Sequence, residues 1–347
     1  MEVRVLSTMN EVGEKGFLKL LLPKLFCSED FVNGFGHDAS IIDLGLEKNI
    51  AFKIDRAPSP VSVKNLWSDY KVWGRLAVVA NVSDLVASGA DAKAFMLSLV
   101  VPGEMESESV EEIVKGCAEA CQEHGVSFVG GDTKEGAETQ VVGACIGTVD
   151  RDHHIGRKVA SAGDRLVIAG KLGGFLGAYH FLKKCGLNHP EHSTMLEALT
   201  RPSARVTEGR YVSYYKVASA GCDLSDGLAD ALSCFCDQET GVVIEEAWLP
   251  MHTFAVRAAA ESGVSLYTYA FGVGDWAIAY VVPEESFDSH LQELPEEVDL
   301  VTIGFFNSTG RRLVKLISGE LVPIPDFKNE HFRSRLEDEG DYLDFIK

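Results

Sequence analysis

The chain has 347 residues, of which 46% are hydrophobic and 24% charged, a globular composition that excludes disorder of the whole chain. Its 32 basic and 52 acidic side chains give a net charge of −20, which argues against nucleic acid as a partner but allows small phosphorylated ligands. No run of about 18 apolar residues predicts a membrane span, and the first residues do not resemble a signal peptide. We therefore expect a cytoplasmic protein with no membrane partner, and we expect its cysteines to be reduced thiols.

The first half alternates predicted strands and helices. Short apolar runs predict strands at 50–54, 94–101, 126–129 and 140–149. An apolar stretch that stops at Gly89 predicts a buried helix at 75–88. A second helix is predicted to begin with a capping box at Ser109 and to end near Gly125.

The polar stretch 150–163 is the expected boundary between two domains, residues 1–150 and 151–347. The second half predicts strands at 165–169 and 276–282, a strand that ends at Asp223, a glycine-rich turn at 170–174 before a helix, and another helix after Gly227. Cys234-Phe-Cys236 could contribute to a metal site, but no second Cys or His pair at zinc spacing accompanies it.

Aspartates recur at predicted turns, at strand ends and within one apolar helix. They are Asp38, Asp55, Asp84, Asp132, Asp223 and Asp226. Each has another explanation, since Asp38 and Asp226 could form turns beside glycine, Asp223 could cap the next helix, and Asp84 could face solvent. Together they predict a site for a hard divalent cation, because Mg²⁺ prefers carboxylate oxygens and bridges phosphates.

The order of these motifs resembles a superfamily of ATP-dependent enzymes. The motifs are Gly36-His-Asp-Ala-Ser40, Asp55, Asn81-Val-Ser-Asp84-Leu-Val-Ala-Ser-Gly-Ala90, Gly130-Gly-Asp132-Thr133, Gly163-Asp164 and Asp223-Leu-Ser-Asp226-Gly-Leu228. The superfamily includes thiamine-monophosphate kinase, aminoimidazole ribonucleotide synthetase, selenophosphate synthetase and a hydrogenase-maturation dehydratase. The likeness is strongest to thiamine-monophosphate kinase and includes a closing segment at 329–332.

This resemblance implies an α+β / α/β fold of the two-domain aminoimidazole ribonucleotide synthetase type. An N-terminal domain with a four-stranded sheet would bind ATP and form a homodimer, beside a C-terminal α/β domain with a short extension. The six aspartates would hold Mg²⁺, and the expected catalytic residues are Asp55, Ser225 and Asp226. The expected nucleotide contacts are His37, Asn81, Gly130, Gly131, Asp132 and Thr133. The adjacent glycines are expected to form a turn that lets the backbone approach the nucleotide closely.

The chain departs from the kinase pattern, mainly on the substrate side. His37 stands where the family has the first of two adjacent aspartates, and Lys53-Ile-Asp55 replaces Ser-Thr-Asp. Residues 57–63 lack the Glu and His of the kinase's substrate segment, and a late motif loses both of its glutamates. We therefore predict a largely retained ATP site and an altered substrate site. The candidate substrate contacts are Arg56, Asp275 and Trp276.

The expected function is Mg²⁺- and ATP-dependent phosphoryl transfer to an oxygen of a small molecule. Two alternatives remain open. In a ligase of the same superfamily, ATP would activate a carboxylate or amide oxygen as a phosphate that an amine then displaces. In the second alternative, the chain would be a non-catalytic nucleotide-binding protein. Six of the seven expected aspartates are present, which argues against this alternative.

Overall fold

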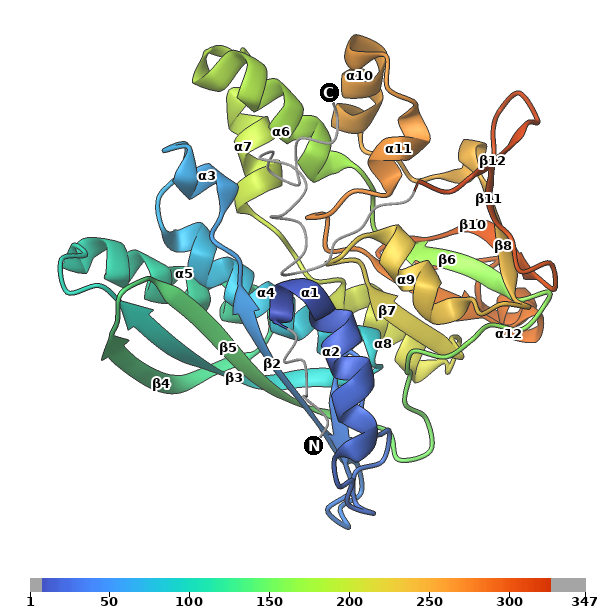
Figure 1. Cartoon of the computed structure of the whole chain (residues 1–347), viewed down its shortest axis with the longest axis horizontal. Coiled ribbons are helices and arrows are strands. Elements are labelled where there is room, and N and C mark those ends of the chain that lie inside the picture. Colours follow the sequence, from blue (N-terminus) through green and yellow to red (C-terminus); the bar gives the residue numbers. More distant parts are fainter. Residues whose placement is uncertain (1–7, 326–347) are drawn as a thin grey trace, which may run out of the picture.

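The N-terminal sheet forms from the first five strands of the chain (Figure 1). The computed structural model describes residues 8–325, so the predicted closing segment at 329–332 lies outside the described residues. The strands are β1 (Ser40–Ile42), β2 (Asn49–Ala57), β3 (Asp91–Val101), β4 (Ser127–Glu135) and β5 (Gln140–Val149). Their order across the sheet is β1-β2-β5-β3-β4. The sheet therefore has five strands rather than the four expected, because the short β1 pairs with the free edge of β2.

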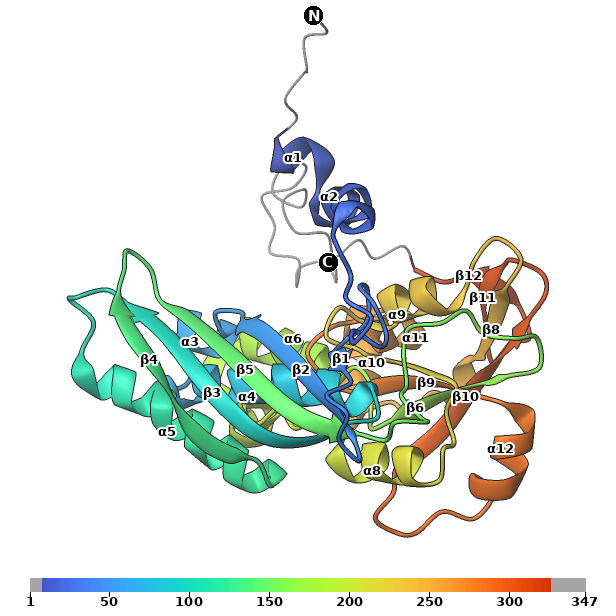
Figure 2. The same cartoon turned by 90° about the horizontal axis from the view of Figure 1, so that it is seen from below.

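The pairing in this sheet is antiparallel except between β3 and β4, which run parallel. The helices of this half are α1 (Met9–Val12), α2 (Glu14–Leu21), η1 (Leu22–Lys24), α3 (Val61–Lys64), α4 (Lys71–Ala87) and α5 (Ser107–His124). Helix α4 contacts β2, β3 and β5, and α5 packs on α4 beside β4. Figure 2 shows the strands of this sheet beside α4 and α5 from a second direction.

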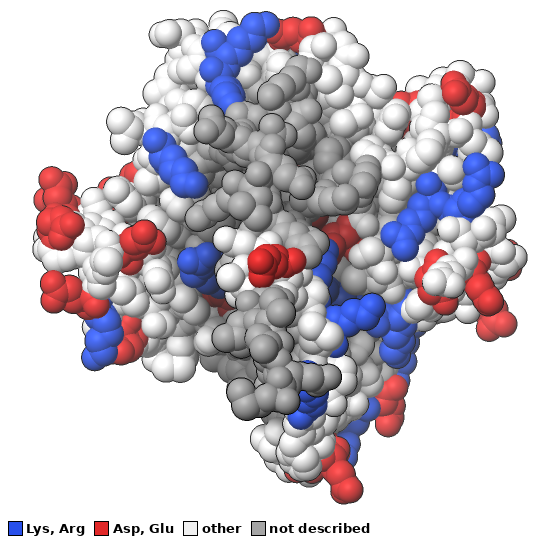
Figure 3. All heavy atoms as spheres, viewed as in Figure 1, with Lys and Arg blue, Asp and Glu red and all other residues white. Residues whose placement is uncertain are grey.

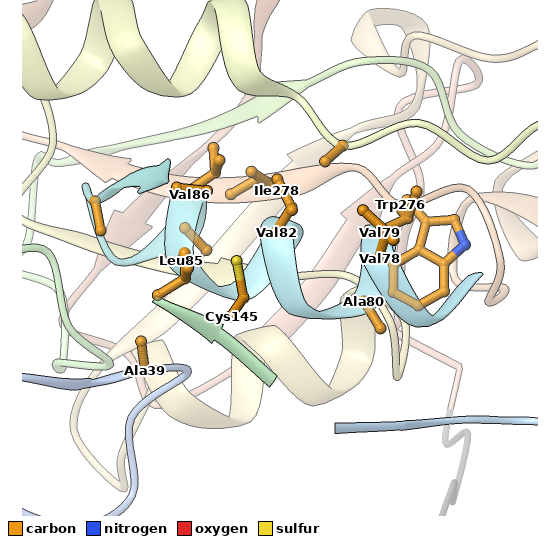
Figure 4. Packing of buried hydrophobic residues seen from close by; sticks show 14 of the residues in the cluster. Ala39, Val78, Val79, Ala80, Val82, Leu85, Val86, Cys145, Trp276 and Ile278 are labelled. Atoms are coloured by element: carbon orange, nitrogen blue, oxygen red, sulfur yellow. The ribbon is translucent and has the colours of Figure 1, made fainter. Parts of the chain in front are cut away.

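Helix α4 joins the cores of the two halves (Figure 4). It is apolar on nearly all of its faces, and 15 of its 17 residues are buried. A helix of this composition needs a partner on every side. Cys145 of β5 approaches from the N-terminal sheet, and Trp276 and Ile278 approach from the C-terminal half. The buried helix predicted at 75–88 is thus confirmed, and it begins four residues earlier, at Lys71.

The C-terminal sheet has seven strands in the order β12-β11-β8-β10-β6-β9-β7. Their bounds are β6 (Arg165–Ala169), β7 (Ala220–Asp223), β8 (Gly241–Glu245), β9 (Ile278–Val282), β10 (Leu300–Asn307), β11 (Arg312–Lys315) and β12 (Leu321–Pro323). The helices are α6 (Gly174–Cys185), η2 (Gly186–Asn188), α7 (His192–Thr200), α8 (Val206–Tyr214), α9 (Leu228–Phe235), η3 (Glu246–Trp248), α10 (Thr253–Ser262), α11 (Leu266–Ala270) and α12 (Glu284–His290). The two sheets confirm the mixed α/β fold class.

Three local predictions were wrong. Strand β4 continues to Glu135, so residues 130–133 lie in a strand that pairs with β3 and not in a turn. Gly131 permits this pairing, because a Cβ there would lie 1.8 Å from the carbonyl oxygen of Leu97. Strand β2 continues past Asp55 to Ala57. Helix α5 begins at Ser107 and has no side-chain cap, so the capping box predicted at Ser109 does not form.

The loop at 150–164 separates the two sheets along the chain. The core around α4 contains residues from both sides of this loop, so the division into two domains stays a prediction. Among the described residues, no helix combines the length and the apolar character that crossing a bilayer requires. On the face in Figure 3, Lys and Arg side chains are interspersed with Asp and Glu.

Candidate functional site

Three of the predicted aspartates converge in the interior, and we call them the acid cluster: Asp38, Asp84 and Asp223. Asp38 lies in the loop before β1, Asp84 in the last turns of α4, and Asp223 at the end of β7. Each is only 4% exposed. The three carboxylates lie close together: Asp223 and Asp38 both raise the pKa of Asp84, and Asp38 also raises the pKa of Asp223. Burying several carboxylates together is costly, so the cluster needs cations, protons or a ligand.

A lysine supplies one cation. The Nζ of Lys53 on β2 lies 2.7 Å from Asp84 Oδ2 and 3.7 Å from Asp55 Oδ2. Burial by itself would lower the pKa of Lys53, but these two carboxylates outweigh it and raise the pKa above its ordinary value. Lys53 therefore carries a positive charge at physiological pH and ties Asp55 to the acid cluster.

An arginine supplies the second cation. The Nε of Arg157 donates to Asp38 Oδ1 at 3.0 Å, and its Nη2 pairs with the same oxygen. The backbone N–H of Arg157 donates to His37 Nδ1 at 2.9 Å, so His37 helps to fix the loop that carries the guanidinium. Burial lowers the pKa of His37, which keeps the ring neutral and able to accept this hydrogen bond.

Asp223 has a free carboxylate oxygen. The Ser225 hydroxyl donates to Asp223 Oδ1 at 3.1 Å, whereas Oδ2 is buried and has no hydrogen-bond partner within the described structure. Burial raises the pKa of Asp223 to about 7, and the Asp38 carboxylate adds to this effect. A buried acceptor with no donor is a position suited to a cation or a proton.

This arrangement fits one divalent cation. Asp38 is engaged by Arg157, and one oxygen of Asp84 is engaged by Lys53. Asp223 Oδ2, which has no partner in the described structure, is a hard ligand suited to Mg²⁺. Asp84, Asp55 and Asp223 all lie near enough to Lys53 to raise its pKa. The chain thus offers fewer free carboxylates for metal than the six that the sequence suggested.

Cysteine side chains also reach the cluster, which sequence reasoning did not anticipate. Cys222 Sγ lies 4.0 Å from Asp38 Oδ1, and oxygens of Asp38 and Asp223 lie within 4.8 Å of this sulfur and of each other. A hydrogen bond from the Cys222 thiol lowers the pKa of Cys234 to about 7. Cys234 therefore interacts with Cys222, which precedes Asp223, rather than with its sequence neighbour Cys236, whose pKa is raised to about 11 by burial.

The predicted nucleotide contacts on β4 lie apart from the acid cluster. Gly130, Gly131, Asp132 and Thr133 are exposed on this edge strand. Asp132 pairs only loosely with Lys134, at 3.6 Å, in solvent. The structure does not bring these residues to the cluster within one chain, and their roles stay predictions.

Asn81 and Asp226 have other neighbours. Asn81 is fully buried in α4, where its amide donates to the Ala77 carbonyl at 2.8 Å and its Oδ1 has no partner in the described structure. Asp226 follows β7 and is near Lys15 of α2, whose ammonium pairs with Asp230. Asp226 thus lies near the N-terminal helix α2, and its catalytic role stays a prediction.

The candidate substrate residues have structural neighbours. The Asp275 carboxylate accepts the backbone N–H groups of Gly173 at 2.6 Å and Phe175 at 2.8 Å, so it caps the start of α6. Burial raises the pKa of Asp275 to about 6. Trp276 has a positive φ of 51° and packs against α4 (Figure 4). Arg56 is exposed on β2, and its backbone N–H donates to Asp55 Oδ1.

The sequence of this chain is similar to those of known proteins. Residues 36–149 match the family of AIR synthase related proteins, N-terminal domain. The thiamine-monophosphate kinase of Methanocaldococcus jannaschii is 28% identical over 221 residues, which cover 60% of this chain and 67% of that kinase. A putative hydrogenase expression/formation protein of the same organism is 26% identical over 303 residues, which cover 82% of this chain and 87% of that protein.

The chain also shares its fold with solved structures. The crystal structure of thiamine monophosphate kinase from Aquifex aeolicus matches with a TM-score of 0.70 at 23% identity, over 88% of this chain and 97% of that chain. The chain is therefore a thiamine-monophosphate kinase-like member of the AIR synthase and selenophosphate synthetase superfamily.

Proposed function

We propose that this chain transfers a phosphoryl group from ATP to an oxygen atom of a small molecule, with Mg²⁺ as the metal. Its relatives make it an ATP-dependent kinase or synthetase. The observation that supports the reaction best is the buried acid cluster with the partnerless oxygen Asp223 Oδ2. Three carboxylates brought together from a loop, a helix and a strand end form a site that a bound cation would stabilise further.

The residues have distinct roles in this proposal. Asp223, Asp84 and Asp55 would hold Mg²⁺, which when bound neutralises phosphate charge and aligns the triphosphate. Ser225 orients Asp223 through its hydrogen bond, so that Oδ2 points away from the hydroxyl. Arg157 balances Asp38 and thereby keeps one acid of the cluster from competing for the metal. Catalysis would then depend mainly on positioning and on electrostatic stabilisation.

We propose further that the acceptor is not thiamine phosphate. Residues 57–63 lack the acidic and basic side chains expected of a thiamine-phosphate kinase. Both oxygens of Asp275 accept hydrogen bonds, from the backbone N–H groups of Gly173 and Phe175 at the start of α6, so this carboxylate is not free to bind a substrate. A buried polar site rejects a ligand that leaves its groups unpaired, and changed polar groups therefore change the substrate.

The experiment incubates the full chain with Mg²⁺ and ATP, first with thiamine phosphate and then with a fractionated metabolite extract, and measures ADP and new phosphorylated products by mass spectrometry. We expect ADP formation that depends on Mg²⁺ and on an extract fraction, and that is lost in Asp223→Asn. The control Asp152→Asn removes an exposed carboxylate and should retain full activity. Efficient turnover of thiamine phosphate would refute the altered acceptor, and absence of turnover with every fraction would favour a non-catalytic nucleotide-binding protein.

A ligase-type reaction is the second candidate. The hydrogenase expression/formation relative matches a larger share of this chain than the Methanocaldococcus kinase does, 82% against 60%. Both reactions begin with phosphoryl transfer to oxygen, but a ligase releases inorganic phosphate when an amine displaces the phosphate. Phosphate release that requires an added amine, together with an unphosphorylated product, would identify the ligase.

A homodimer is also proposed, with the N-terminal sheet as its interface. Phe52, Ile54, Met96 and Ile146 are exposed by 44%, 70%, 51% and 36%. Phe52 pairs directly with Ile146, and Ile54 and Met96 both pair with Ala144, so these side chains share the sheet face opposite α4. A continuous apolar face of this kind is typical of a surface that binds a partner, here a second copy of the chain.

The dimer is tested by light scattering after gel filtration. We expect the chain to run at twice its monomer mass, and Ile54→Glu to run as a monomer, because a charge at the centre of the apolar face opposes association. Val159→Glu is the control, since Val159 is exposed by 49% in the loop between the two sheets. A monomeric wild-type chain, or a dimer that survives Ile54→Glu unchanged, would contradict the proposed interface.

A further inference from the structure

Lys53 is placed by strand geometry. Side chains alternate along β2, so Phe52 and Ile54 lie on the exposed face and Lys53 and Asp55 lie on the face toward α4. The Lys53 side chain is 23% exposed, and its ammonium lies 2.7 Å from Asp84 Oδ2, whose side chain is 6% exposed. Lys53 thus reaches from the N-terminal sheet into the interior, where the acid cluster lies.

The carboxylates around Lys53 outnumber the cations that pair with them. Asp38, Asp84, Asp223 and Asp55 supply four carboxylates, and Lys53 and Arg157 supply two cations. When all four acids are ionised, two negative charges remain, which is the charge of one divalent cation. The acids of the cluster by themselves therefore neutralise one divalent cation, and a second ion would have to draw its ligands and its counter-charge from the nucleotide.

The Lys53 ammonium also pairs with a carboxylate oxygen that could otherwise bind a metal ion. A Mg²⁺ ion binds carboxylate oxygens at about 2.1 Å, and an ammonium at hydrogen-bond distance from the same oxygen repels it. Asp84 Oδ2 is committed in this way, whereas Asp223 Oδ2 is not. Only part of the cluster is therefore open to metal.

We infer that Lys53 is a built-in cation that takes the place of one divalent metal ion in the ATP site. The inference rests on the proposed function, because it assumes that the acid cluster is where the metal and the nucleotide bind. Its consequence is that the chain binds one catalytic metal ion, and that removal of Lys53 opens a position for a second.

The test counts Mn²⁺, which replaces Mg²⁺ and is visible by electron paramagnetic resonance. The full chain is titrated with Mn²⁺ in the presence of the non-hydrolysable ATP analogue AMPPNP, and bound metal is counted by equilibrium dialysis. We expect about one Mn²⁺ per chain for the wild type and about two for Lys53→Thr, with spin coupling between neighbouring ions only in the variant. Lys53→Arg keeps the charge and should bind about one.

Lys93→Thr is the matched control, because Lys93 lies on β3 of the same sheet but pairs with Asp91 at the surface. It should bind about one Mn²⁺, like the wild type. Two bound Mn²⁺ in the wild type would overturn the inference without reference to any variant. An unchanged count in Lys53→Thr, in a protein that circular dichroism shows to be folded, would overturn it as well. If no protein binds Mn²⁺ together with AMPPNP, the proposed function itself fails.

Discussion

Replacing Asp223 by Asn should stabilise the free protein, although it removes a proposed metal ligand. The change keeps the size of the side chain and keeps an oxygen that can accept the Ser225 hydroxyl. It replaces the partnerless Oδ2 by a neutral group or by an N–H₂ donor beside the other two acids of the cluster. Above about pH 7, the free chain therefore loses a buried negative charge whose desolvation Lys53 and Arg157 offset only in part.

The size of the effect follows from the pKa of Asp223. Burial raises this pKa from an ordinary 3.8 to about 7 in the folded chain. Because the folded chain holds this proton more tightly than the unfolded chain, the contribution of Asp223 to stability is largest below pH 4 and is lost as the pH rises to about 7. A difference of about 3 pKa units corresponds to about 4 kcal/mol. The variant should thus be more stable than the wild type by up to about 4 kcal/mol at pH 8 and by less than about 1 kcal/mol at pH 4.

The assay is urea denaturation followed by tryptophan fluorescence, at several pH values between 4 and 8 and without divalent metal. Asp152→Asn is the control, because it also removes one carboxylate from a chain of net charge −20 but does so at the surface. Saturating Mg²⁺ with AMPPNP should then stabilise the wild type and leave Asp223→Asn unchanged. A variant that is less stable than the wild type at pH 8, or a stability gap that is independent of pH, would refute this reasoning.

Substitutions at three further positions test the same structure by urea denaturation and amide exchange. Arg157→Ala leaves buried Asp38 without its cation and should cost about 3–5 kcal/mol of stability, whereas a loss below about 1 kcal/mol would contradict the ion pair. Asp275→Ala removes the hydrogen-bond acceptor at the start of α6 and should cost about 1–3 kcal/mol of stability. Asp275→Asn should cost less stability, because its amide oxygen still accepts a hydrogen bond. Equal losses of stability in the two variants would show that the cap does not matter. Gly131→Ala places a Cβ 1.8 Å from the Leu97 carbonyl oxygen, so it should separate β4 from β3 and speed amide hydrogen exchange in β4, and unchanged exchange there would contradict the close approach.

The local patterns of the sequence predicted seven of the twelve strands and four of the twelve α-helices in the described part of the chain. The strands at 140–149 and 165–169 have the bounds that their apolar runs indicate, and the helix that ends before Gly89 is buried as its composition requires. Errors occur where pairing between distant segments decides the outcome. The glycines at 130 and 131 favour a turn locally, but β3 provides a parallel partner that extends the strand through them.

The acid cluster was predicted in part. Of the six aspartates that sequence reasoning grouped, the structure brings Asp38, Asp84 and Asp223 together, and their role as metal ligands stays a prediction. Sequence reasoning also grouped Asp132 with them, although this residue lies exposed on the edge strand β4 of the same chain. It assigned Asp275 to the substrate, and the structure shows its carboxylate capping α6.

The sequence by itself predicted many of the segments that form strands and helices, because the periodicity of apolar residues and the positions of glycine act over a few neighbouring residues. It also determined the inventory of acidic side chains from which a cation site could be built. Only the tertiary structure decided which cations meet those acids, since Lys53 and Asp84 belong to a strand and a helix, and Arg157 reaches Asp38 from 119 residues away. These ion pairs depend on how both sheets pack around α4, and no short-range pattern encodes that packing.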